Sequence, residues 1–310
     1  MRGRFWKWGS FVEKPCILCI GLSGESVFLQ VDHLARPGET LAADRLFREP
    51  GGKAYNQAVA AAKLGAESRL ITALGRDGSG QSCLERLQKE GVKTRCFLKE
   101  CATAYAAIHT ASDGENTVTV FAGASACLTA EDIRQAADAF TGADFLLLTC
   151  ELPREALLQA FVLAKEQGVP VLLNPAPYHP IAKELLQEAR LTTPNQGEAV
   201  ALFGLSSNAS LEQLAQAVIQ TATPTVITLG ARGALLCADG RSQLIAAPCV
   251  QAVDTTGAGD AFSAALAVRQ ALGESLSASV SYAVRYAAQT TLHAGVLDSY
   301  PFASEIDEGM

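Results

Sequence analysis

No stretch of this 310-residue sequence reaches the ~18 consecutive apolar residues that a membrane helix needs. The sequence has no excess of positive charge, since it contains 25 Lys and Arg residues and 32 Asp and Glu residues, for a formal net charge of -7. Nucleic acids and anionic membrane surfaces bind concentrated positive charge, so the composition argues against both as partners. Hydrophobic residues make up 49% and charged residues only 18%, which excludes a disordered chain and indicates a folded globular protein.

The cysteines lack the pattern of a disulfide framework or a zinc site. Nine is an odd number, and a chain of this length needs no disulfides to bury enough surface. Cys16 and Cys19 have C-x-x-C spacing, but they lie in an apolar run without a second close pair. Residues 1–15 lack the apolar core and cleavage site of a secretion signal. We therefore expect a cytoplasmic protein with an N-terminal extension over residues 1–15.

Short apolar runs alternate with helical patterns from residue 17 onwards, which indicates parallel strands linked by crossover helices. The apolar runs lack in/out alternation, as expected for strands covered on both faces. Predicted strands lie at 17–22, 69–74, 145–149, 169–173 and 225–229. Predicted helices lie at 55–64, 80–90, 130–140, 154–167, 211–221, 258–272 and 276–292. The sequence thus predicts one α/β domain over residues 16–310, built on a wound, mostly parallel sheet flanked by helices.

Two segments break this pattern. Residues 104–110 and 117–121 are alternating and β-prone, and the turn signal at 112–116 between them predicts an antiparallel hairpin. Residues 27–47 are also extended and rich in turn residues. Active-site covers are commonly built from such segments, so we predict a small β-sheet lid from about residues 24–48 and 102–122.

The sharpest local signal is Asp-Thr-Thr-Gly-Ala-Gly-Asp at residues 254–260, just before an apolar helix pattern. Its glycines allow a turn that directs several N–H groups at one point, and the helix start adds partial positive charge, so a phosphate could bind there. The carboxylate of Asp260 would repel that anion unless it has a separate task, such as accepting a proton from an attacking hydroxyl. The alternative is that an aspartate caps the helix and the glycines form a tight turn.

Other polar segments follow predicted strands or open a helix, where wound α/β sheets bind ligands. They are Gly-Gly-Lys at 51–53 with Asn56 and Gln57, Asn-Pro-Ala-Pro at 174–177, Thr-Pro-Asn-Gln-Gly-Glu at 193–198 and Thr-Leu-Gly-Ala-Arg-Gly at 228–233. This ordered set resembles the ribokinase or PfkB family of sugar kinases from about residue 17 to residue 301. Members of that family transfer the γ-phosphoryl group of ATP to a sugar hydroxyl with Mg²⁺, and many are activated by K⁺.

The resemblance implies a role for each matching residue. Asp260 would be the catalytic base, and the N–H groups of Gly257, Ala258, Gly259 and Asp260 itself would hold the transferring phosphoryl group. The residues implied for ATP and the water shell of Mg²⁺ are Asn195, Glu198, Thr228, Gly230, Arg232 and Gly233. Those implied for the acceptor are Gly52, Lys53, Asn56 and Glu151, with Ser26 at the position of a family aspartate. Those implied for a monovalent cation are Asp254, Thr256, Thr290, His293, Gly295 and Ser299.

Two of these residues have a plainer interpretation. Glu151 could be a solvated loop acid. His293 lies where the family uses only the backbone, so a surface histidine is favoured over a catalytic base.

The sequence departs from the family in the acceptor region. Members generally have Asn-x-Asp after the first strand, where this chain has Gly24-Glu25-Ser26. The Ser26 hydroxyl makes one neutral bond where a carboxylate makes two charge-assisted ones. Glu25 compensates only if the strand end twists, because neighbouring side chains point to opposite faces. Tyr55 also departs from the family pattern, and would either reduce the pocket or offer it an aromatic face.

The leading hypothesis is therefore an ATP-dependent kinase of a small sugar or sugar derivative, which forms a homodimer through its lid. The two departures argue against D-ribose as its acceptor. One alternative is a nucleoside kinase of the same fold, in which Tyr55 stacks on the base. Another is a non-catalytic ligand-binding descendant, against which the intact Asp260 and its glycine loop argue.

Overall fold

The computed structural model describes residues 4–7, 10–112 and 115–306. Within them, nine strands form the main sheet, in which β13, β14 and β15 pair antiparallel and the other neighbours pair parallel. The order is β15 (Arg241–Ile245), β14 (Ala234–Ala238), β13 (Thr225–Thr228), β12 (Leu191–Thr192), β11 (Val171–Asn174), β10 (Phe145–Thr149), β3 (Cys16–Ile20), β6 (Glu67–Gly75) and β7 (Lys93–Lys99). This confirms the predicted wound, mostly parallel sheet.

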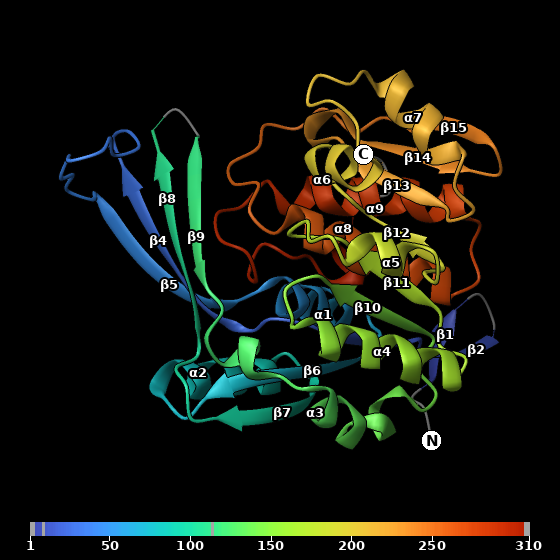
Figure 1. Ribbon diagram of the computed structural model, residues 1–310, viewed down its shortest axis with the longest axis horizontal. Coiled ribbons are helices and arrows are strands. Elements are labelled where there is room, and N and C mark those ends of the chain that lie inside the picture. Colours follow the sequence, from blue (N-terminus) through green and yellow to red (C-terminus); the bar gives the residue numbers. More distant parts are fainter. Residues whose placement is uncertain (1–3, 8–9, 113–114, 307–310) are drawn as a thin grey trace.

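Helices cover both faces of this sheet (Figure 1). Because successive strand residues point to opposite faces, Ile17 and Cys19 of β3 join one core and Leu18 and Ile20 join the other. The first face carries α1 (Lys53–Lys63), α8 (Ala258–Ala271) and α9 (Leu276–Thr290). The second carries η1 (Gly123–Cys127), α3 (Ala130–Gln135), η2 (Ala137–Phe140), α4 (Arg154–Glu166) and α5 (Ala182–Leu186). A third cluster under α6 (Gln196–Phe203) and α7 (Leu211–Ile219) completes the far end.

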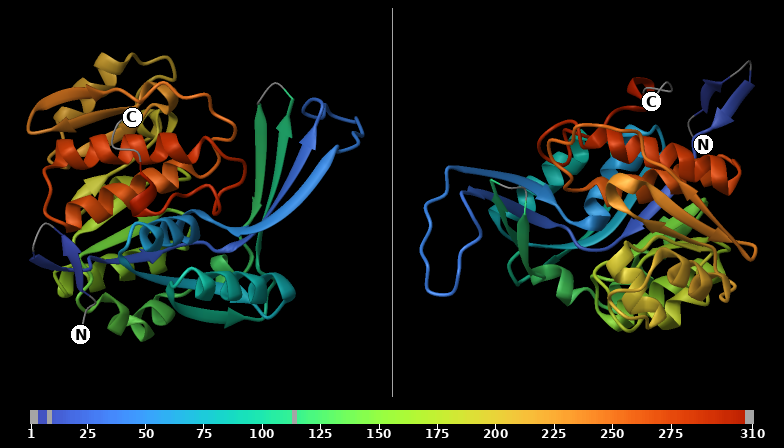
Figure 2. Two further views of the ribbon diagram at one scale, coloured as in Figure 1. Left: turned by 180° about the vertical axis from the view of Figure 1, so that it is seen from behind. Right: turned by 90° about the horizontal axis from the view of Figure 1, so that it is seen from above.

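A second sheet stands off the body as the predicted lid (Figures 1 and 2). Its order is β5 (Arg45–Gly51), β4 (Gly24–Val31), β8 (Ala104–Ala111) and β9 (Asn116–Phe121). The two central strands, β4 and β8, pair parallel, and each edge strand pairs antiparallel. The chain passes between body and lid four times, after β3, after β5, after β7 and after β9. α2 (Gly78–Lys89) packs beside the lid (Figure 1).

Some boundaries differ from the predictions. The predicted extension over residues 1–15 contains a hairpin of β1 (Arg4–Lys7) and β2 (Ser10–Glu13), at the end of the body away from the lid (Figure 1). The helix predicted over 130–140 is broken, because the N–H of Ala136 donates to Asp132 and to Ile133 and tightens the last turn. Residues 113 and 114 of the predicted lid turn lie outside the described residues. No helix in the described part of the chain is long and apolar enough to cross a membrane.

Candidate active site

The start of α8 is built around Gly257. This residue has φ 78°, a conformation that favours glycine, and a Cβ there would lie 2.4 Å from Cγ1 of Val296 and 2.6 Å from Oη of Tyr300. The carboxylate of Asp254 accepts from the N–H of Thr256 at 2.9 Å, ahead of the helix. No described side chain caps α8, so neither aspartate acts as the helix cap. The N–H of Ala258 donates to the carbonyl of Thr255 at 3.3 Å, and the N–H groups of Gly259 and Asp260 remain available to an anion.

Asp260 lies in the first turn of α8 and is only 8% exposed. Nδ2 of Asn56 donates to its Oδ2 at 2.8 Å, and Nε2 of Gln57 donates to its Oδ1 at 3.3 Å. Burial raises the pKa of Asp260, and the nearby Lys53 ammonium and these two amides oppose that rise. Each carboxylate oxygen has one donor and retains capacity for another, which suits a group that takes up a proton.

Lys53 and Glu151 share this electrostatic site. Burial alone would lower the pKa of the Lys53 ammonium, but Asp260, Glu151 and Glu198 outweigh it and raise that pKa. Burial and the charge of Asp260 raise the pKa of Glu151 to about 7, although Lys53 opposes them. Oε2 of Glu151 accepts from the hydroxyl of Thr149 at 3.1 Å, at the end of β10. Glu151 is therefore half-buried beside charged groups, which differs from the solvated loop acid of the plainer interpretation.

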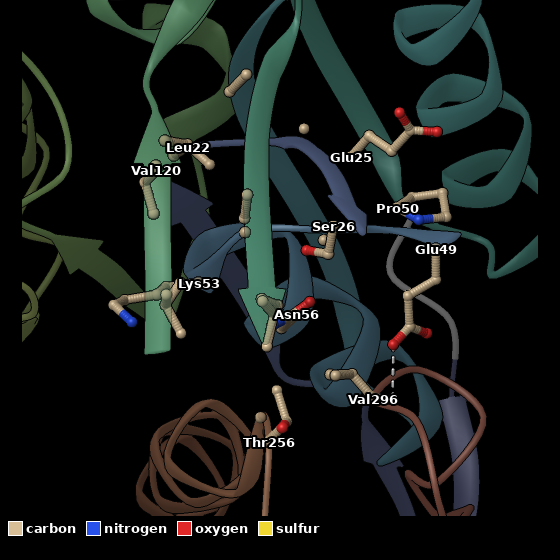
Figure 3. Close-up of a pocket in the computed structure, with 18 of the residues that line it drawn as sticks. Leu22, Glu25, Ser26, Glu49, Pro50, Lys53, Asn56, Val120, Thr256 and Val296 are labelled. Carbon is tan, nitrogen blue, oxygen red and sulfur yellow. Dashed lines mark hydrogen bonds between the residues drawn. The ribbon is translucent and has the colours of Figure 1, made fainter. Parts of the chain in front are cut away.

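A small cavity of about 180 Å³ lies between the lid and the start of α8 (Figure 3). The predicted residues that line it come from four separate segments and are Ser26, Gly52, Lys53, Asn56, Glu151, Thr256, Gly257 and Asp260. The lid adds an apolar wall of Phe28, Ala106, Ile108, Val118 and Val120. This volume is below the ~300–1,000 Å³ of pockets for drug-sized ligands, so it suits a small molecule.

A larger cavity of about 570 Å³ lies on the other side of the α8 start. Its lining includes the predicted residues Asn195, Thr228, Gly230, Gly233, Ala258 and Gly259, together with apolar side chains such as Phe262 and Val284. Arg232 does not line it, and instead donates from Nη2 to Oε1 of Gln196 at 2.7 Å on the exposed surface.

Glu198 and Asn195 form a capping box at the start of α6. Oε2 of Glu198 accepts from the N–H of Asn195 at 2.9 Å, and Oδ1 of Asn195 accepts from the N–H of Glu198 at 2.8 Å. Burial raises the pKa of Glu198, while Lys53 lowers it and Asp260 raises it. The charges of Lys53 and Asp260, which line the small cavity, therefore affect the pKa of Glu198, whose capping partner Asn195 lines the large cavity.

The residues predicted as cation ligands lie in two segments, 254–256 and 290–299, which the side chain of Asp254 connects. Its Oδ2 accepts from the N–H of Gly295 at 3.2 Å, and the N–H of Val253 donates to the carbonyl of Thr291 at 2.7 Å. The hydroxyl of Thr290 donates to Ala287 at 2.8 Å, and that of Ser299 donates to Val296 at 2.8 Å. The side chain of His293 is exposed, as the surface interpretation predicts.

One expectation about the acceptor side is wrong. Tyr55 is fully buried and donates from its hydroxyl to the carbonyl of Cys83 at 3.0 Å, so it neither narrows the cavity nor offers it an aromatic face. It is one position before Asn56 on α1, and a helix turns by about 100° per residue, so the two side chains face different ways. Glu25 lines the cavity, but its carboxylate is already paired, at 3.2 Å from the hydroxyl of Ser79 and 3.6 Å from Arg48.

Residues 15–303 match the family of pfkB carbohydrate kinases. The chain belongs to this family. A ribokinase of Staphylococcus aureus (strain COL) is 34% identical over 299 residues, which cover 94% of this kinase and 98% of that relative. The ribokinase of Thermotoga maritima superposes with a TM-score of 0.84 at 32% identity, covering 94% and 98% of the two chains. The structure of Arabidopsis thaliana ribokinase complexed with ribose and ATP gives a TM-score of 0.83 at 28% identity, covering 94% and 97%.

Proposed function

We propose that this PfkB-type carbohydrate kinase transfers the γ-phosphoryl group of ATP to a hydroxyl group of a small sugar or sugar derivative. The observation that carries the proposal is the meeting of two cavities at the start of α8. Asp260 lines the small cavity and Gly259 lines the large one, and they are consecutive in the chain. The nucleotide belongs in the large cavity and the acceptor in the small one.

In this arrangement the carboxylate of Asp260 takes the proton as the O–H bond of the acceptor breaks. The acceptor oxygen bonds to the γ-phosphorus, the bond from that phosphorus to the β,γ-bridging oxygen breaks, and ADP leaves. The N–H groups from Gly257 to Asp260 hold the charge of the phosphoryl group in transfer. Lys53 keeps Asp260 ionised by lowering its pKa.

Mg²⁺ fits the side of the site formed by Asn195 and Glu198. Glu198 uses Oε2 in the capping box, which leaves Oε1 for a water of the ion's hydration shell. When bound, Mg²⁺ neutralises charge on the β- and γ-phosphates.

A monovalent cation such as K⁺ fits the two loops that Asp254 joins, with Thr256, Thr290, His293, Gly295 and Ser299 contributing through the loop backbone. Within the described residues, no group of three or more His, Cys, Asp or Glu side chains forms a metal site. One carboxylate with carbonyl oxygens suits a weakly bound K⁺ better than a divalent ion. A cytoplasmic location, where K⁺ and ATP are plentiful, completes this proposal.

The alternatives have less support. Burial of Tyr55 removes the basis for stacking of a nucleoside base. The acidic and basic groups assembled around Asp260 argue against a non-catalytic descendant, because a binding site without chemistry has no need of a base with a perturbed pKa. The loss of a carboxylate at Ser26 supports an acceptor other than D-ribose.

The variant Asp260→Asn tests the assignment. We expect turnover on a panel of sugars to fall on the order of 10²–10⁴-fold, because a general base contributes about that much, with ADP affinity unchanged. The matched control is Asp239→Asn, an exposed aspartate at φ 50° between β14 and β15, where asparagine fits the backbone equally well. Undiminished turnover by Asp260→Asn would contradict the role of the base.

A further inference from the structure

A second acidic residue faces the small cavity, and it comes from the lid. Glu49 on β5 lies directly opposite Ser26 on β4 in the antiparallel register, so both side chains point to the same face (Figure 3). Both residues line the small cavity. Glu25 also lines the cavity, but its carboxylate is already bound to the hydroxyl of Ser79 and lies beside Arg48, whereas Glu49 has no described side-chain partner.

The carboxylate of Glu49 has unused hydrogen-bonding capacity. Its Oε1 accepts from the N–H of Val296 at 2.9 Å, and its Oε2 accepts from the N–H of Leu297 at 3.4 Å. An ionised carboxylate has about four acceptor positions, so one position on each oxygen is free. No Lys or Arg of the described residues lies within ion-pair distance of Glu49, and burial raises its pKa. Additional donors are thus needed to stabilise this charge.

Other unsatisfied polar groups lie in the same corner. Oδ1 of Asn56 is buried and has no hydrogen-bond partner among the described residues. A Cβ placed on Gly51 would lie 2.8 Å from Oγ of Ser26 and 3.6 Å from Oδ1 of Asn56, so these two atoms face the same small space. Nδ2 of Asn56 is bound to Asp260. Asn56 therefore spans the distance between the base and the corner formed by Ser26 and Glu49.

The lid row that contains Glu49 changes from polar to apolar along its length. The register places Glu49, Ser26, Ala106 and Val120 side by side across β5, β4, β8 and β9. All four residues line the cavity. An acceptor lying across this row would turn hydroxyl groups towards Glu49 and a C–H edge towards Val120.

We propose that Glu49, together with Ser26, selects the acceptor by binding a pair of neighbouring hydroxyl groups on the edge remote from the hydroxyl that is phosphorylated. This rests on the proposed kinase function and deepens it. Two hydroxyl groups match the two free acceptor positions of the carboxylate, one on each oxygen. The hydroxyl pair reaches Glu49 while the bonds from Val296 and Leu297 stay in place.

The test compares Glu49→Gln with Asp44→Asn, a control at an exposed acidic residue in the connection between β4 and β5, away from the cavity lining. Binding of D-pentoses, D-hexoses and their monodeoxy derivatives is measured by isothermal titration calorimetry, and phosphorylation is measured with ATP. We expect Glu49→Gln to weaken binding of the preferred sugar about 10–100-fold, the value of losing charged hydrogen bonds, with the KM for ATP unchanged. Asp44→Asn should bind it within twofold of the native protein. The deoxy sugar that lacks one of the bound hydroxyls keeps the other, so Glu49→Gln should weaken its binding less than it weakens binding of the preferred sugar.

A second variant covers the case in which Glu49→Gln loosens the lid. Ser26→Asp combined with Glu49→Gln moves the carboxylate across the strand pair to β4, and should restore affinity for some sugars with a changed order of preference. Equal binding by native protein, Glu49→Gln and Asp44→Asn would overturn the inference and leave the kinase function standing. If an amino sugar binds more tightly than the corresponding hydroxyl sugar, and Glu49→Gln removes this preference, the proposed recognition of a hydroxyl pair is wrong.

Failure of the proposed function gives a different result. If the native protein phosphorylates no acceptor but binds a sugar through Glu49, the kinase assignment fails while the binding site stands. If it neither binds nor phosphorylates any sugar of the panel, both are rejected.

Discussion

In the proposed mechanism Asp260 acts as a base only while it is ionised, and Lys53 is the residue that favours this state. Burial raises the pKa of Asp260, and the positive charge of Lys53 is the largest opposing influence. A base is inactive once protonated, so kcat/KM should fall as the pH drops through this pKa. The acid limb of the kcat/KM profile thus reports the pKa of Asp260 in the presence of the Lys53 charge.

In Lys53→Met the opposing charge is gone and the pKa of Asp260 rises further. We expect the acid limb of kcat/KM to move to higher pH, with a loss of activity that is smaller at alkaline pH than at neutral pH. Initial rates between pH 5 and pH 9 provide the measurement. A uniform loss at every pH would show that Lys53 only binds substrate. Lys165→Met, an exposed lysine paired with Glu188, serves as the control.

At the scale of elements, the glycines at the start of α8 have separable roles. Gly257 is required by the fold, because its φ is 78° and a Cβ would collide with Val296. A Cβ on Gly259 would meet nothing within 4 Å. Gly259 lines the large cavity, so in the proposed function the nucleotide occupies the open space beside it.

Gly259→Ala should therefore keep or raise the melting temperature, because alanine favours a helix over glycine by ~1 kcal/mol. We expect kcat/KM for ATP to fall on the order of tenfold to a hundredfold, the cost of a misplacement of about 1 Å. Gly257→Ala, by contrast, should lower both kcat/KM and the melting temperature. Thermal unfolding and ATP kinetics together distinguish the two variants. An unchanged kcat/KM for ATP in Gly259→Ala would show that the phosphoryl group does not lie beside Gly259.

The elements also show what the sequence can and cannot predict. β3 and β10 were predictable because strands buried on both faces leave continuous apolar runs. β15 is mostly exposed and polar, and β12 has only two residues, so neither leaves such a run. α6 was missed although its Asn195 and Glu198 form a capping box, a signal that is readable in the sequence.

The site was predictable where it depends on a local motif, and not where it depends on register. Asp260 and Asn56 belong to short motifs, and the structure brings them within 2.8 Å. Glu49 belongs to no motif. It faces the cavity only because β4 and β5 pair in one register across the connection over residues 32–44, which the sequence does not determine.

At the scale of the whole molecule, the lid exposes more apolar surface than a monomer ordinarily does. Phe47 of β5 and Val118 and Val120 of β9 share one face of the lid and are 43%, 54% and 53% exposed. Edge strands with exposed apolar residues are templates for association, so a second copy is the expected cover. This supports the proposed homodimer through the lid.

Sedimentation equilibrium at micromolar concentration should give twice the chain mass of 32.5 kDa. Val118→Asp should dissociate the dimer, because it places an unpaired charge in the contact. Thr119→Asp, the next residue on β9 and on the opposite face, should leave it intact. A native protein that sediments at 32.5 kDa at every concentration would refute the dimer.

The four passages of the chain between body and lid have a mechanical consequence. A cover tethered by one hinge could swing freely, and a single break in that hinge would release it. Here a protease that cuts one passage leaves three covalent connections, and the parallel pairing of β4 with β8 binds the two halves of the cover together. The cover is thus restricted to tilting as one plate, and it survives the kind of nick that disables a simple flap.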